Sequence, residues 1–232
     1  MRKGSKGRLF AVLILDIAMI IMESHALGVS WQEHQGGMFR FYTQDSNVLA
    51  FICCLVCAVC GVKSLIRGVK IPAWTRHLRF YAASCMTLTL LVASCLLVPS
   101  DPNRTFASFM LEGKYLYLHT VCPLVMLALF YLHPGPQFRE KHALLALVPT
   151  LIYGTILLSM NTGGAISGPY PFLRVREQAG YVTTAGCITV LAFAYTSARL
   201  LAVSSGIAGK KHRPLRNRMR PDEENQTGTF ES

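Results

Sequence analysis

Six apolar stretches of about 20 residues each constrain the fold of this chain more than any other feature. They lie at residues 9–30, 41–62, 80–98, 115–132, 142–160 and 181–203. An α-helix rises about 1.5 Å per residue, so each stretch is long enough to cross about 30 Å of hydrocarbon. None alternates apolar and polar residues as the strands of a membrane barrel do. We therefore expect an all-α polytopic membrane protein, a bundle of six transmembrane helices.

The composition agrees with a single membrane domain. Of the 232 residues, 52% are hydrophobic and only 15% are charged, which is outside the usual range of soluble domains. The connections are short, so we expect one membrane domain over residues 1–205 and no separate soluble domain. Residues 206–232 are basic and polar, and we expect a disordered cytoplasmic tail that binds anionic lipid headgroups. The net charge of +11 then needs no nucleic-acid partner.

The distribution of basic residues predicts the orientation. The first stretch follows a basic segment that resembles the start of a signal peptide, but Asp16 interrupts it and no clear cleavage site follows, so we expect a retained helix. The N-terminus, residues 63–79, residues 133–142 and the tail from residue 199 hold 18 of the 23 lysines and arginines. By the positive-inside rule both termini are cytoplasmic, and we expect the cell membrane as the location.

Polar residues open the second apolar stretch, which begins Phe-Tyr-Thr-Gln-Asp-Ser-Asn at residue 41. Thr43 and Asn47 are four apart and share a helix face, Ser46 flanks them, and Asp45 projects to the opposite side. The predicted topology places Thr43 near the outer surface and His119, in the fourth stretch, at a similar depth. Pro123 lacks the N–H that would bond the carbonyl of His119, so we expect the helix to bend there.

This constellation suggests nucleophilic chemistry. A threonine hydroxyl is a poor nucleophile without a base, so Thr43 would be the nucleophile and His119 its general base. Asn47 is a candidate donor to an oxyanion. Glu23 and His25 lie near the same predicted level, where a carboxylate could orient an imidazole.

A further candidate is the loop after the fifth stretch, where Tyr170, Pro171 and Phe172 precede the sixth. The two prolines at 169 and 171 forbid regular helix. We expect this segment to form an outer lid over the cluster and to contact substrate. The alternative is an interfacial loop with an aromatic belt.

Structural alternatives remain open for these candidates. Thr43, Ser46 and Asn47 could cap the helix or bond neighbouring helices, and His119 could be a satisfied core histidine. Glu23 and His25 could face headgroups, and Asp16 could pair with a cytoplasmic-side arginine or stay protonated. The eight cysteines, including the pair Cys57 and Cys60, fit small apolar residues better than a metal site, and we expect no metal or cofactor. Asn103 begins a glycosylation sequon on the predicted outer side.

Three motifs resemble those of the six-helix androgen-induced-protein family and its bacterial relatives. They are an aromatic-aromatic-Thr-x-x-Ser-Asn-x-Leu opening at 41–49, Leu118-His119 followed by Pro123, and Tyr-Pro-Phe-Leu at 170–173. Animal members are multi-pass hydrolases of fatty acid esters of hydroxy fatty acids that use a threonine and a histidine. The resemblance implies these roles for Thr43 and His119.

We therefore expect a lipid-ester hydrolase or acyl-transfer enzyme whose substrate is a membrane lipid or amphiphilic ester. One alternative is a small transporter or flippase with Asp16, Glu23, His25 and His119 along its path. Another is a non-catalytic membrane scaffold in which the polar groups only fix helix packing.

Overall fold

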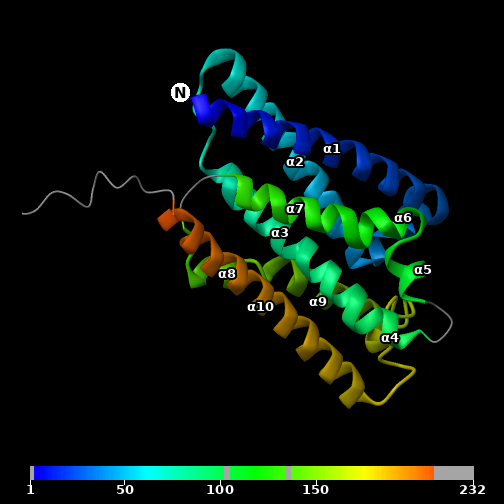
Figure 1. Ribbon diagram of the computed structural model, residues 1–232. Helices are drawn as coiled ribbons and strands as arrows, with labels where there is room; N and C mark the ends of the chain where they lie inside the picture. Colours follow the sequence, from blue (N-terminus) through cyan, green and yellow to red (C-terminus); the bar gives the residue numbers. More distant parts are fainter. Residues whose placement is uncertain (1–2, 102–104, 134–136, 212–232) are drawn as a thin grey trace, which may run out of the picture.

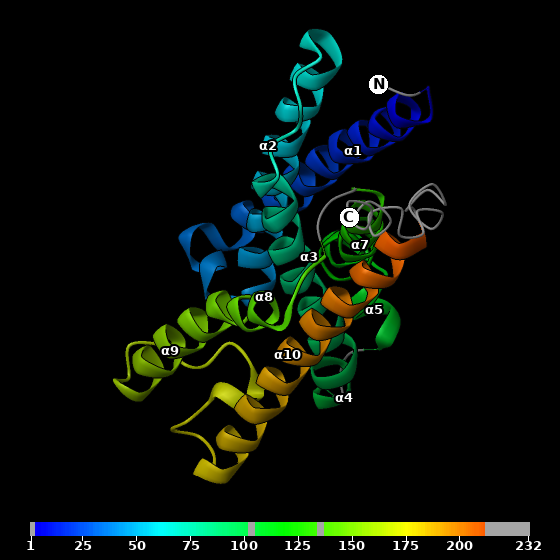
Figure 2. The same ribbon diagram turned by 90° about the vertical axis from the view of Figure 1, so that its left-hand side faces the viewer.

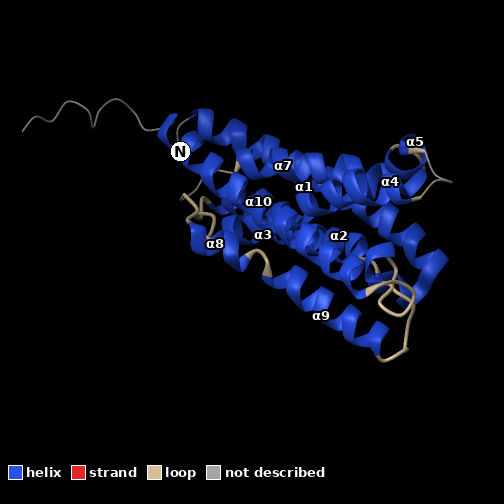
Figure 3. Ribbon diagram, turned by 90° about the horizontal axis from the view of Figure 1, so that it is seen from below, coloured by secondary structure: helices blue, strands red, loops and turns tan. Residues whose placement is uncertain are grey.

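The computed structural model describes residues 3–101, 105–133 and 137–211. Asn103 of the sequon and the tail from residue 212 lie outside the described residues. Over the described ranges the structure is helical with no strand (Figure 3). The all-helical prediction is confirmed, and six helical segments are long and apolar enough to cross a membrane.

The helical elements match the six predicted stretches. In chain order they are α1 (Lys3–His34), the 3₁₀ helix η1 (Gln35–Arg40), α2 (Tyr42–Arg67), α3 (Trp74–Val92), the π segment η2 (Ala93–Leu97), α4 (Val98–Ser100), α5 (Phe106–Met110), α6 (Gly113–Tyr115), the π segment η3 (Leu116–Val121), α7 (Cys122–Leu132), α8 (Glu140–Leu145), α9 (Val148–Thr162), the 3₁₀ helix η4 (Pro171–Leu173) and α10 (Gly180–Lys211). The candidate spans are Lys6–Arg40, Tyr42–Arg67, Trp74–Ser100, Gly113–Leu132, Glu140–Thr162 and Gly180–Ser205.

Most helices run past the ends that hydropathy predicts. α2 continues to Arg67 and ends at Gly68, whose φ of 68° is the left-handed conformation that terminates many helices. α3 begins at Trp74, so the predicted connection of residues 63–79 shortens to 68–73. α10 continues to Lys211, into the segment predicted to be a disordered tail.

Proline interrupts three of the six segments. Pro99 follows η2, Pro123 follows η3, and Pro149 follows the turn that separates α8 from α9. A proline supplies no backbone N–H, so the preceding turn widens to π geometry or breaks. The predicted helix at 142–160 is therefore two helices, α8 and α9.

Four helices pack around a common core. α1 contacts α2 and α7, and α3 contacts α2, α7 and also α10, so that α3 lies at the centre (Figure 1). Figure 2 shows α9 diverging from this group. The first turn of α1 and the last turn of α10 lie at the same end of the molecule, as six crossings require (Figure 1).

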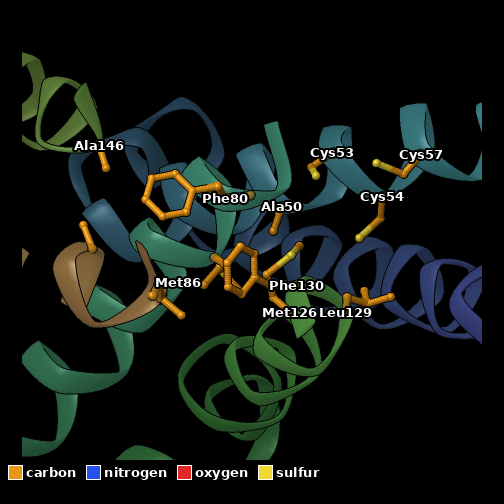
Figure 4. Packing of buried hydrophobic residues seen from close by; sticks show 14 of the residues in the cluster. Ala50, Cys53, Cys54, Cys57, Phe80, Met86, Met126, Leu129, Phe130 and Ala146 are labelled. Atoms are coloured by element: carbon orange, nitrogen blue, oxygen red, sulfur yellow. The ribbon is translucent and has the colours of Figure 1, made fainter. Parts of the chain in front are cut away.

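The core between these helices combines aromatic rings with small and sulfur-containing side chains. Phe80 of α3 and Phe130 of α7 are fully buried and pack together, with ring centroids 6.0 Å apart (Figure 4). The neighbouring positions include Ala50, Cys53, Cys54, Met86 and Met126. Small residues let the backbones of adjacent helices approach closely.

One ion pair lies inside the bundle. Arg79 of α3 donates from Nη2 to Asp16 Oδ2 of α1 at 2.9 Å, and both side chains are buried. The structure thus resolves the open question of Asp16, which pairs with an arginine. Counting Arg79 among the residues of a surface connection was wrong, because α3 begins at Trp74 and carries Arg79 into the core.

Candidate active site

Thr43 and His119 meet, as the sequence analysis predicts. Thr43 stands in the first turn of α2 and His119 in the π segment η3. Thr43 Oγ1 lies 3.5 Å from His119 Nε2, and the side chains are 7% and 3% exposed. A contact of this length in a ligand-free site is within what catalytic pairs show before substrate tightens them.

The other ring nitrogen of His119 fixes its tautomer. Nδ1 lies 2.8 Å from the backbone carbonyl oxygen of Phe109, which can only accept a hydrogen bond. Nδ1 therefore carries the proton in the neutral ring, and Nε2 presents its lone pair to Thr43. This is the tautomer that a general base for Thr43 needs.

The short helix α5 holds the imidazole in place. Its last carbonyls have no intrahelical donor, so Phe109 O accepts from His119 while Met110 O accepts from Thr120 Oγ1 at 2.7 Å. The His119 ring lies between those of Phe109 and Tyr115, with centroid distances of 4.9 and 5.3 Å. These contacts restrict rotation of the imidazole.

Asn47 bonds a neighbouring helical segment, which is the structural alternative that the sequence analysis left open. Its Nδ2 donates to Thr43 O at 2.6 Å and to Leu118 O at 3.2 Å. In a π turn the carbonyl of Leu118 would bond the N–H of residue 123, which is proline, so Asn47 supplies the missing donor. Both amide hydrogens are used, so Asn47 is not available as the oxyanion donor; it joins α2 to η3.

Ser46 bonds a neighbouring helix. Its Oγ lies 2.7 Å from Thr89 Oγ1 of α3 and 2.9 Å from Thr43 O. No side chain caps α2, whose N-cap position is Phe41, so the capping alternative is wrong. Ser46 and Asn47 instead hold the first turn of α2 against α3 and η3.

Tyr170 brings its phenol from the 163–179 loop to the Thr43 hydroxyl. Its side chain is buried, and the phenol lies near enough to Thr43 and Tyr153 to interact with both. Burial raises the pKa of Tyr170 above its ordinary value, although the interaction with Thr43 acts in the opposite direction. A phenol that stays protonated can donate a hydrogen bond beside Thr43.

The loop that carries Tyr170 is tightly built. Asn161 Nδ2 donates to Ile166 O at 3.0 Å, and its Oδ1 accepts from Val175 N at 2.9 Å, so one side chain ties both sides of the loop. A Cβ on Gly168 would lie 2.5 Å from the backbone of Leu173, so only glycine fits there. Phe172 packs against Gly186 of α10, where an added Cβ would lie 2.4 Å from it.

Two cavities meet at Thr43. The first, which we call the vestibule, measures about 330 Å³ and includes His119, Lys114, Pro171 and Arg174 in its wall. The second, which we call the apolar chamber, measures about 150 Å³ and lies among α3, α9 and α10. Thr43, Tyr170 and Leu97 belong to both walls. Thr43 thus stands at the boundary between a polar and an apolar compartment.

Glu23 and His25 do not join the cluster. The Glu23 carboxylate is fully buried, so the headgroup-facing alternative is wrong for this residue. Its oxygens have no hydrogen bond of regular geometry among the described residues, and the Cys122 thiol lies near enough to interact with it. His25 is exposed and packs edge-on against Tyr117 with centroids 5.9 Å apart. The carbonyl of Phe109 orients His119 in place of the expected Glu23.

Across the ranges that the structure describes, no group of three or more histidine, cysteine or acidic residues could hold a metal ion. All eight cysteines are free thiols. Three of the four cysteines of α2, Cys53, Cys54 and Cys57, pack in the apolar core with α3 and α7, and Cys60 is partly exposed.

A comparison of the chain with protein-family models, with curated proteins and with solved structures gives no match. The resemblance to the androgen-induced-protein family rests on the three motifs alone.

The sequence analysis missed two groups of the site. The role of the Phe109 carbonyl depends on the short helix α5, which the sequence analysis did not predict. Thr105 caps the start of this helix, because its Oγ1 accepts from Ser108 N at 3.1 Å. The Thr-x-x-Ser spacing is the signal that could have indicated this helix. The Tyr170 hydroxyl was expected in a lid, but not beside Thr43.

Proposed function

We propose that the protein crosses a membrane six times, with both termini on the cytoplasmic side. The outer surfaces of α9 and α10 support this, because large apolar side chains are exposed there, including Ile152, Ile156, Ile188 and Leu200. The ionisable side chains Asp16, Glu23 and Arg79 are buried inside the bundle. Apolar groups outside and polar groups inside are the arrangement that lipid favours. We place the protein in the cell membrane.

We infer that it is a lipid-ester hydrolase or acyl-transfer enzyme of the threonine type. The observation that carries this proposal is the contact between Thr43 Oγ1 and His119 Nε2, with the Nδ1 proton held by a carbonyl. A hydroxyl facing the lone pair of a fixed, neutral imidazole is the arrangement of an activated nucleophile. The roles also agree with those that the family resemblance implies.

The reaction proceeds in two halves. Thr43 Oγ1 attacks the ester carbonyl carbon while its proton moves to His119 Nε2. The tetrahedral intermediate expels the alcohol, which takes the proton from Nε2, and an acyl-threonine ester remains. Water, or a second alcohol in a transfer reaction, then attacks this ester with its proton passing to Nε2. Collapse releases the acid or new ester and returns the proton to Thr43.

The Tyr170 hydroxyl is the best candidate to stabilise the oxyanion. It is buried, it lies beside Thr43, and it is neutral, so it can donate to the negative oxygen of the intermediate. Asn47 is already engaged by two carbonyls.

The two cavities support an amphiphilic substrate. The apolar chamber, with Leu88, Val92 and Leu158 in its wall, suits a hydrocarbon chain. The vestibule, with Lys114 and Arg174, suits the polar part of the ester and admits water. An ester linkage between the two parts would lie at Thr43.

Replacement of Thr43 tests the proposal. We expect Thr43→Val, which keeps the shape and removes the hydroxyl, to lower turnover of a medium-chain nitrophenyl ester at least about a thousandfold. Thr43→Ser should retain measurable activity. The matched control is Thr87→Val, because Thr87 bonds only within α3, to Ala83 O. Unchanged turnover and unchanged labelling by a fluorophosphonate probe in folded Thr43→Val would refute the proposal.

The transporter alternative has less support. It requires Asp16 and His25 along one path, yet Asp16 is bound by Arg79 and His25 lies on the outer surface. Uptake into proteoliposomes that depends on Asp16 would favour it over ester chemistry.

A further inference from the structure

A third cavity lies at the opposite end of the bundle from Thr43. It measures about 400 Å³ and is enclosed by the first turns of α1, the last turns of α2, the 68–73 connection and the start of α3. Figure 1 shows this end, where α1 begins and α2 leads into α3, and Figure 2 shows α1 and α2 diverging toward it. Its volume is within the range of small-molecule sites.

Two residues of the cavity wall, Arg79 and His133, contain buried nitrogen atoms that make no hydrogen bond among the described residues. Arg79 bonds Asp16 through Nη2, and the side chain is 0% exposed. Its Nε and Nη1 have no hydrogen bond of regular geometry among the described residues, although the Cys57 thiol lies near enough to the guanidinium to interact with it. Nδ1 of His133, at the end of α7, also has no hydrogen-bond partner. Buried polar atoms are nearly always satisfied. These nitrogens are closed off from the cavity itself, so the Arg79 guanidinium contributes positive charge from behind its wall.

The cavity carries an excess of positive charge. Its wall contains four basic residues, Arg8, Lys70, Arg76 and Arg79, and a single acidic residue, Asp16. Arg76 is held by the carbonyl of His133 and lies over the Phe130 ring, 5.3 Å from the centroid. Its guanidinium thus has a fixed position.

The pKa of His133 reflects both burial and the surrounding positive charges. Burial lowers its pKa to about 3, and the positive charges of three arginines act in the same direction: Arg79, Arg76 and Arg8. The site therefore favours an anion over any further cation, including a proton.

The rest of the wall is apolar. It includes Leu9, Val12 and Leu13 of α1, Val69 and Ile71 of the connection, and Leu132 of α7. An anion bound here would have hydrocarbon on one side and guanidinium groups on the other. Arginine forks match the geometry of phosphate oxygens.

We propose that this cavity is a binding site for a phosphate-bearing lipid headgroup, separate from the ester site and lying in the cytoplasmic half of the bundle. Arg8 and Lys70 bind the phosphate oxygens, the buried guanidinium of Arg79 adds positive charge behind the wall, and the acyl chains leave between α1 and α2. The site makes the protein responsive to anionic lipid independently of its ester chemistry.

Binding of fluorescent phosphatidic acid to the purified full-length protein in uncharged detergent tests the proposal. We expect wild type to bind phosphatidic acid at least tenfold more tightly than fluorescent phosphatidylcholine. The double substitution Arg8→Gln with Lys70→Gln should weaken binding at least tenfold. The matched control is Lys63→Gln, which removes an exposed charge of α2 outside the cavity.

A second variant fills the cavity without changing charge. A Cβ on Gly61 would meet Leu9 and Leu13 at 3.8 Å, so Gly61→Leu projects into the space and should abolish binding. If this variant does not fold, the charge variant decides alone. If inorganic phosphate displaces the lipid probe at equal concentration, the cavity is a site for free phosphate and the assignment to a lipid headgroup is overturned. Equal binding by wild type and the charge variant overturns the proposal.

Discussion

At the scale of single residues, the site depends on which atoms are already engaged. His119 is useful as a base because Phe109 O holds its Nδ1 proton, and Asn47 is unavailable as an oxyanion donor because two carbonyls hold its amide. The sequence predicted that Thr43 and His119 meet, because the predicted topology places both side chains at a similar depth in the membrane. It could not predict these partners, because backbone carbonyls have no signature in the side-chain pattern.

Tyr170→Phe tests the oxyanion donor. The ring contacts with Phe41 and Phe172 remain while the hydroxyl is lost, so we expect kcat to fall about 10²-fold to 10³-fold with little change in KM. Because burial raises the pKa of Tyr170 above its usual value near 10, this donor stays protonated across the neutral range.

The control is Tyr131→Phe, which removes a hydroxyl that lies 2.9 Å from Ser204 Oγ and belongs to neither cavity wall. If both variants keep full kcat, Tyr170 has no part in the chemistry.

Asn47→Leu tests the structural role of Asn47. The change leaves the buried carbonyl of Leu118 without its donor and weakens the attachment of α2 to η3, so we expect a loss of at least about 2 kcal/mol in the free energy of unfolding. Thermal unfolding in detergent measures it, with Ser46→Ala as the milder comparison. Loss of activity with unchanged stability would instead show that Asn47 takes part in the reaction.

At the scale of elements, prolines determine where the helices depart from regular geometry. Hydropathy predicted six helices because length and apolar character persist through a π segment. It could not predict the change of register, because a π segment and an α-helix have the same composition. The start of α3 was also missed, since four of the six residues 74–79 are polar and yet Thr75 and Arg79 are fully buried.

Pro123→Ala tests the register of η3. Alanine restores the missing N–H, so the segment gains a regular hydrogen bond and the reason for the π turn is removed. We expect turnover to fall more than tenfold while the unfolding temperature stays equal or rises. Pro99→Ala is the comparison, because Pro99 follows the other π segment, η2, which does not carry His119. Unchanged turnover in Pro123→Ala would separate the π turn from catalysis.

At the scale of the whole molecule, the two polar sites lie at opposite ends of the bundle. Thr43 and His119 lie at one end of α2, and the arginine-lined cavity lies at the other. The proposed orientation puts the ester site in the outer half and the cavity in the cytoplasmic half. Neither the packing of α9 nor the position of the 163–179 loop follows from hydropathy, because both depend on contacts between distant segments.

Single cysteines test this orientation. Gly36 is exposed at the end proposed to face outward, and Arg67 is exposed at the last turn of α2. In a background with exposed Cys95→Ser, we expect a membrane-impermeant maleimide to label Gly36→Cys in intact cells and Arg67→Cys only after permeabilisation. Labelling of both from the same side would contradict six crossings with cytoplasmic termini.

The ion pair between Asp16 and Arg79 also has a consequence for biogenesis. If the proposed six crossings form during synthesis, Asp16 enters the bilayer before Arg79, its partner, has been made. A lone carboxylate at the centre of a helix costs about 2.5–3.5 kcal/mol on insertion scales. Pairing with Arg79 of the third segment offsets this cost, so in a membrane-inserted chain the pair would favour early association of the first and third segments.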